Sequence, residues 1–62
     1  MLSIGDEVFL VNNGTTNTVK VWTVFAIEGP YVVLQHGTSE YAHGIRKEDV
    51  RKVLSVSLRR PA

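Results

Sequence analysis

The sequence contains no cysteine, and this absence excludes disulfide bonds and every thiolate metal site. Its two histidines, His36 and His43, are too few for a closed structural zinc site, which takes four ligands. We interpret them as ordinary surface residues and predict no metal site. A chain of 62 residues is only marginally stable without such aids, because a fold of this size buries roughly 60% of its unfolded surface. Oligomerisation is the aid left open, so we expect a homo-oligomer.

Long apolar runs and glycine-rich loops are also missing. No run approaches the ~20 apolar residues that a membrane helix needs. The first seven residues, MLSIGDE, lack the basic start and apolar core of a signal peptide, so we expect a cytoplasmic protein without membrane contact. The five glycines are dispersed, which argues against a phosphate loop and a nucleotide cofactor.

Catalytic motifs are absent as well. Polar residues of the types used in acid–base or nucleophilic catalysis do occur, but none belongs to a motif with a defined mechanism. They are His36, Ser39, Glu40, His43 and Asp49. A single small domain also has little room for a concave pocket of several hundred Å³. We therefore predict a non-enzyme, with no catalytic, cofactor or metal residues.

Runs rich in β-branched and aromatic residues alternate with short polar turns, which predicts an all-β meander, sandwich or barrel. The expected strands are Glu7–Asn12, Val19–Ile27, Tyr31–His36, Glu40–Arg46 and a short Arg51–Leu54. A polar loop over residues 12–17, a tight turn at Glu28-Gly29-Pro30 and a helical or 3-10 turn over residues 47–50 separate them. Residues 1–54 form the predicted domain, and residues 55–62 a basic C-terminal tail that is either a sixth strand or a frayed end.

The second predicted strand is apolar on both faces, because Trp22 and Val24 alternate with Val21 and Phe25. We predict a β-bulge near Phe25-Ala26 that brings Val24 and Ile27 onto one inner face. Apolar side chains are still in surplus for the inside of a small barrel. The surplus predicts an exposed interface patch, although the same residues would also suit a satellite core at the barrel ends. The candidate interface residues are Phe9, Val11, Trp22 and Phe25.

Charge is distributed unevenly along the chain. Residues 1–45 carry one basic and four acidic residues, a sum of −3, whereas residues 46–62 carry six basic and two acidic ones, a sum of +4. This pattern is typical of an anion-binding face, or of a solvated C-terminal segment. Clustered cations contact phosphates and exposed aromatic rings stack on bases, which points to nucleic acid. The candidate nucleic-acid-binding residues are Lys20, Trp22, Tyr41, His43, Arg46, Lys47, Arg51 and Lys52.

Three short motifs carry a resemblance over about residues 4–54. Gly5-Asp6-Glu7-Val8 resembles the opening of SH3-like barrels, and Gly29-Pro30-Tyr31-Val32-Val33 is similar to a hairpin in the C-terminal barrels of retroviral-type integrases. Residues 44–53 resemble the closing strand, 3-10 turn and last strand of that architecture. KOW-type ribosome-binding and transcription-factor modules, and small phage or plasmid accessory proteins, share these features. The resemblance implies a five-stranded SH3-like barrel with one 3-10 turn before the last strand.

A more distant resemblance is to the plasmid-borne type II dihydrofolate reductases, in which such a barrel is the whole chain. Their signature is a Val-Gln-Ile-Tyr segment in a late strand, whereas this chain reads Ala42-His43-Gly44-Ile45-Arg46 and shares only the isoleucine. This departure argues against reductase activity. We therefore expect a binding module for DNA or RNA that uses its C-terminal basic face. The alternative is a protein-interaction or self-assembling accessory domain that uses the apolar patch.

Overall fold

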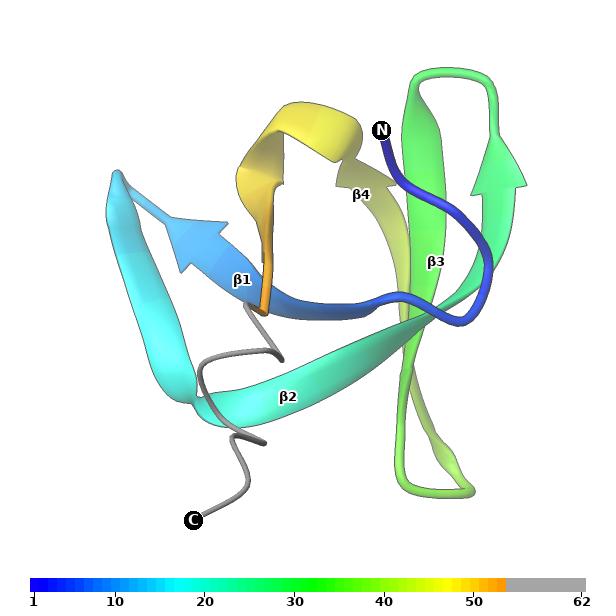
Figure 1. The fold of residues 1–62 in the computed structure, drawn as a ribbon, viewed down its shortest axis with the longest axis horizontal. Coiled ribbons are helices and arrows are strands. Elements are labelled where there is room, and N and C mark those ends of the chain that lie inside the picture. Colours follow the sequence, from blue (N-terminus) through cyan, green and yellow to red (C-terminus); the bar gives the residue numbers. More distant parts are fainter. Residues whose placement is uncertain (54–62) are drawn as a thin grey trace, which may run out of the picture.

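A computed structural model describes residues 1–53 of the protein, which form one antiparallel sheet of five strands (Figure 1). The strands are β1 (Glu7–Asn12), β2 (Thr15–Glu28), β3 (Tyr31–His36), β4 (Glu40–Arg46) and β5 (Val50–Lys52), and a 3-10 turn, η1, spans Lys47–Asp49. The strand order is β4-β3-β2-β1-β5, so the last strand returns to pair with the first. The predicted all-β class, with a 3-10 turn before the last strand, is confirmed. Within residues 1–53, no helix is long and apolar enough to cross a membrane.

The boundaries of β1, β3 and β4 are those predicted from the sequence. Each lies between turn residues that stop an extended run, such as Gly29-Pro30 before β3 and Gly37 after it. The last strand begins one residue earlier than predicted, at Val50, and ends at Lys52. Leu54, which we had placed in this strand, and the tail of residues 55–62 lie outside the described residues.

The connection between β1 and β2 differs from the prediction. We expected a polar loop over residues 12–17, but the turn consists only of Asn13 and Gly14, and β2 already begins at Thr15. Both turn residues have positive φ, 53° for Asn13 and 78° for Gly14. This is the conformation of a type I′ turn, whose twist matches that of the flanking strands, and Asn-Gly is its preferred sequence. The Asn-Gly pair therefore forms a tight hairpin instead of a loop.

Register shifts bend the sheet where its strands must curve around the core. Val24 pairs with Leu34 and Ala26 with Val33, so Phe25 is the extra residue of a bulge, as predicted. The bulge puts Val24 and Ile27 on the same inner face, where Val24 is buried and Ile27 packs against the core.

The β3–β4 pair contains a second register shift, which the sequence analysis missed. Val32 pairs with Ile45 and Leu34 with Ala42, so two residues of β4 lie opposite one residue of β3. One of the two is Gly44, whose φ of 67° is costly for residues with a side chain.

One hydrophobic core fills the concave side of the sheet. Its buried members are Val8, Trp22, Val24, Val32, Leu34 and Val50, drawn from β1, β2, β3 and the start of β5. Trp22 is only 6% exposed, so the prediction that it lies on the surface as an interface or stacking residue is wrong. Strand alternation places Trp22 on the same side as Val24, and the curvature of the sheet makes that side the inner one.

The remaining candidate interface residues do not form a single patch. Phe9 and Val11 are half-buried on β1, whereas Phe25 is exposed on β2. The pair Glu7 and Thr23 lies between Phe9 and Phe25, and because the strands are antiparallel the two phenylalanines extend in opposite directions from it. Their separation along the sheet is therefore about four residue steps, or roughly 13 Å.

Candidate nucleic-acid interface

In the described part of the chain, side-chain ion pairs around η1 engage some of the charged residues and leave others unpaired, and we call this the sorting of charge around η1. Arg46 Nε lies 3.1 Å from Asp49 Oδ2, and Arg46 Nη1 lies 3.4 Å from Glu48 Oε2. The hydrogen bond to Asp49 and the negative charges of Asp49 and Glu48 raise the pKa of the Arg46 guanidinium above its ordinary value. Both acidic residues of η1 therefore pair with Arg46 and offset its charge, so Arg46 is less available to a phosphate than the free cation that we predicted.

The other three basic residues of this region surround one open pocket of about 500 Å³. Lys47, Arg51 and Lys52 form its polar wall, and Leu2 and Val50 its apolar part. We call these three cations the basic face. Within residues 1–53, no carboxylate lies within ion-pair distance of Lys47 or Arg51.

Two members of the basic face are held in place by neighbouring groups. Arg51 Nη1 donates to the backbone carbonyls of Glu48 at 2.8 Å and Val50 at 2.9 Å. These hydrogen bonds hold Nη1 in place, and because both acceptors are neutral the positive charge of the guanidinium is not offset by them. Lys52 Nζ lies 3.5 Å from Asp6 Oδ2, a long ion pair between an exposed lysine and a half-buried carboxylate. The basic face therefore carries a net positive charge in which Lys47 and Arg51 are the accessible cations.

Lys20 is not part of this face. Its Nζ lies 2.8 Å from Glu40 Oε2 and 5.0 Å from the centre of the Trp22 ring. The hydrogen bond from Lys20 lowers the pKa of the Glu40 carboxyl below its ordinary value. His36 also contacts the Trp22 ring, at 5.6 Å between centroids, and its Nδ1 lies 2.9 Å from the Val21 carbonyl oxygen. Lys20 and His36 thus cover Trp22, and Lys20, predicted as a nucleic-acid contact, is engaged with Glu40 and the Trp22 ring.

Tyr41 and His43 lie on the convex face of the sheet, where Phe25 joins them. The rings of Phe25 and Tyr41 meet edge to face at 5.2 Å and 76°, and those of Tyr41 and His43 lie 6.3 Å apart at 33°. We call these three side chains the aromatic platform. The sequence analysis placed Phe25 in an interface and Tyr41 in a nucleic-acid site, and missed that they touch. Their contact reaches across β3 and depends on the strand order β4-β3-β2, for which the sequence carried no signal.

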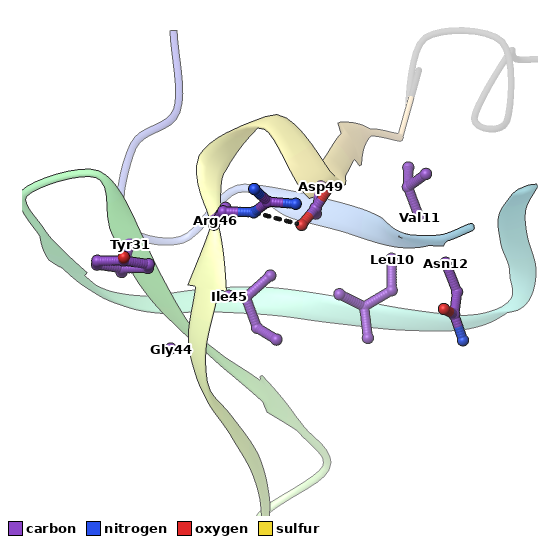
Figure 2. Close-up of a pocket in the computed structure, with 8 residues that line it drawn as sticks. All are labelled: Leu10, Val11, Asn12, Tyr31, Gly44, Ile45, Arg46 and Asp49. Carbon is purple, nitrogen blue, oxygen red and sulfur yellow. Dashed lines mark hydrogen bonds and ion pairs between the residues drawn. The ribbon is translucent and has the colours of Figure 1, made fainter. Parts of the chain in front are cut away.

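A second pocket, of about 430 Å³, opens where β1 and β4 approach each other without pairing (Figure 2). Leu10 and Ile45 supply its apolar lining, and Figure 2 shows the Arg46–Asp49 ion pair above them. Asn12 stands at one side and Tyr31 at the other. The pocket offers space for an apolar group beside a hydrogen-bonding edge, and nothing in the sequence pattern pointed to it.

Five of the eight predicted nucleic-acid residues fall into two regions, the aromatic platform with Tyr41 and His43 and the basic face with the three cations, whereas Lys20, Trp22 and Arg46 belong to neither. Tyr41 and Arg46 lie opposite Gln35 and Tyr31, which are four residues apart on β3, so the two are roughly 13 Å apart along the sheet. The aromatic platform lies near the N-terminal end of β4, and the basic face lies beyond its C-terminal end. One region offers exposed rings and the other offers cations, and neither resembles a catalytic set. Among residues 1–53, no three acidic, histidine or cysteine side chains gather closely enough to hold a metal ion.

Comparisons with known proteins place the chain in no family. No family model, no curated protein and no solved structure matches it.

Proposed function

We propose that this chain is a non-catalytic module that binds the phosphate backbone of DNA or RNA through the basic face. The observation that carries the proposal is the sorting of charge around η1. Glu48 and Asp49 would otherwise dilute the cations, but both are paired with Arg46. Lys47 and Arg51 are left to act on an external anion, with Lys52 beside them.

The proposal includes a fold of the SH3-like barrel type. Two features of the topology support it, namely the return of β5 to pair with β1 and the 3-10 turn that leads into β5. A strongly bent sheet with one core on its concave side is the arrangement that barrel closure needs. In such a barrel, β4 and β5 would be neighbours joined by η1.

The same geometry gives less support to a protein-interaction module that uses the predicted apolar patch. Trp22, the largest side chain of that patch, is in the core. Phe9 and Phe25 lie roughly 13 Å apart on the sheet, with Glu7 and Thr23 between them. A scattered apolar surface offers a weaker anchor than the well-packed central cluster on which protein interfaces depend.

A fluorescence-anisotropy titration with a labelled single-stranded oligonucleotide, repeated between about 50 and 200 mM salt, tests the proposal. Phosphate binding gives a log–log salt slope of about −0.7 per contact on a single strand, hence about −2 for three cations. Lys47→Gln should reduce the magnitude of this slope by about 0.7. Non-specific binding of this kind has a Kd of about 10⁻⁴ to 10⁻⁶ M.

The matched control is Thr15→Glu, which changes the net charge by the same amount at the exposed β1–β2 hairpin. It should leave the slope as in the parent protein. Absence of binding at the lowest salt concentration would refute the proposal. Equal slopes for Lys47→Gln and the parent protein would refute the basic face as the contact surface.

A further inference from the structure

The aromatic platform is a group of exposed rings whose positions are fixed. Gln35 Nε2 donates to the Tyr41 hydroxyl at 3.1 Å, and β-sheet pairing sets Gln35 directly opposite Tyr41. Phe25 packs against the same ring from the bulge of β2. An edge-to-face contact occupies only one of the four ring faces of the pair. The platform therefore holds aromatic rings in place and leaves ring faces open to solvent, with Phe25 51% and Tyr41 40% exposed.

The charge next to the platform is neutralised. Glu40 precedes Tyr41 in the chain, and its carboxylate would repel a phosphate strand that passed over the ring. Lys20 Nζ holds that carboxylate at 2.8 Å. The pair makes this end of β4 compatible with a polyanion.

The exposed area of the rings is small for a protein partner. The exposed surface of Phe25 and Tyr41 together is roughly 200 Å², because an aromatic side chain has an area of about 150–250 Å². A stable protein interface takes ~800 Å² from each partner. Thr23 and Gln35 are paired in the sheet beside the rings. Their polar side chains end the aromatic surface on that side. One or two nucleobases fit this area, because stacking needs a ring face and not a broad surface.

We propose that the aromatic platform binds an unpaired nucleobase, so that the module prefers single-stranded nucleic acid. This inference rests on the proposed function, since the basic face would hold the phosphates of the same strand. Tyr41 lies roughly 13 Å along the sheet from Arg46, and Lys47, the first cation of the basic face, follows Arg46 directly, a spacing compatible with the ~4 nucleotides at the short end of single-strand sites on small barrels. A duplex keeps its bases stacked inside and would engage only the basic face.

The experiment compares two labelled oligonucleotides of equal length and charge, one of thymidines and one abasic, on the unaltered protein. Stacking should make the abasic strand bind roughly 5- to 150-fold more weakly, with the same salt slope. Tyr41→Leu should weaken binding of the thymidine strand towards the level of the abasic one. Tyr31→Leu is the matched control, because Tyr31 is exposed to a similar extent, 46% against 40% for Tyr41, and lies outside the platform.

The outcomes separate the two proposals. Equal affinity for the thymidine and abasic strands overturns the stacking site and leaves the basic face standing. Failure of both strands to bind at low salt overturns both proposals. A third outcome is that the parent protein sediments as a dimer, that Tyr41→Leu dissociates it, and that both strands bind with equal affinity. This outcome would make the platform a protein interface and overturn the stacking site. The comparison of strands uses the parent protein, so it decides the question even if a variant unfolds.

Discussion

Replacing Arg46 by methionine tests whether its ion pairs keep carboxylates away from the basic face. The guanidinium holds Asp49 at 3.1 Å and Glu48 at 3.4 Å, and both carboxylates lie on the same 3-10 turn as Lys47. In Arg46→Met they lose this partner while the cations of the basic face remain. The cations beside them are then Lys47 on the same turn and Arg51, which donates to the Glu48 carbonyl, and an ion pair with either would remove one phosphate contact.

The expected magnitude follows from the number of contacts. With three contacts on a single strand the salt slope is about −2.1, and a fourfold rise in salt weakens binding about 18-fold. With two contacts the slope is about −1.4 and the same rise weakens binding about 7-fold. Arg46→Met should therefore bind more weakly at low salt and lose less affinity as salt increases, although Arg46 itself touches no phosphate.

The assay is the anisotropy titration with a single strand, carried out on Arg46→Met and on a triple variant that also carries Glu48→Gln and Asp49→Asn. Removal of both carboxylates should restore the parent slope, because no anion is left to compete for Lys47 or Arg51. If Arg46 were instead a direct phosphate ligand, the triple variant would keep the reduced slope. That result would refute the sorting of charge around η1.

Two further predictions concern stability. Leu34 is fully buried in β3, an inner strand of the sheet, so Leu34→Ala should cost about 2–5 kcal/mol of unfolding free energy, and Leu34→Met less than about 1.5 kcal/mol. Urea unfolding followed by the fluorescence of the buried Trp22 measures both, and equal midpoints would contradict the core assignment. The backbone hydrogen bond from Ser3, at 2.8 Å, and the charge of Lys52 lower the pKa of Asp6 below its ordinary value of 3.8. A lowered pKa stabilises the fold above the unfolded-state pKa and loses that contribution as the pH falls through the folded-state pKa. Asp6→Asn should therefore unfold at a lower urea concentration than the parent at neutral pH. The difference should shrink as the pH falls below 3.8 and vanish below the lowered folded-state pKa, and a difference that persists in stronger acid would contradict this linkage.

Local residue chemistry was sufficient to predict most of the sheet. β1, β3 and β4 have the predicted bounds, because β-branched and aromatic runs end at glycine, proline and polar turn residues. The bulge at Phe25 was also predictable, since only an extra residue places both Val24 and Ile27 inside. The start of β2 was missed because Asn13-Gly14 was interpreted as part of a loop, and a type I′ turn lets the threonines that follow pair at once.

The site was less predictable than the sheet. Tyr41 and His43 share a face because they are two residues apart on a strand, and the sequence shows this directly. The contact of Phe25 with Tyr41 depends on the order β4-β3-β2, which no local pattern specifies. The cluster of cations after residue 45 was visible in the sequence, but its division between Arg46 and the basic face depends on side-chain geometry at η1.

The sequence by itself determined that this protein is all-β, where most of its strands begin and end, and that its positive charge gathers near the C-terminal side. These properties follow from backbone propensity, turn chemistry and composition, which act over a few residues. Only the tertiary structure decided that Trp22 is buried and that Phe25 and Tyr41 meet in the open. Alternation along a strand defines two faces, but the curvature of the whole sheet decides which face is covered, and strand order decides which side chains become neighbours.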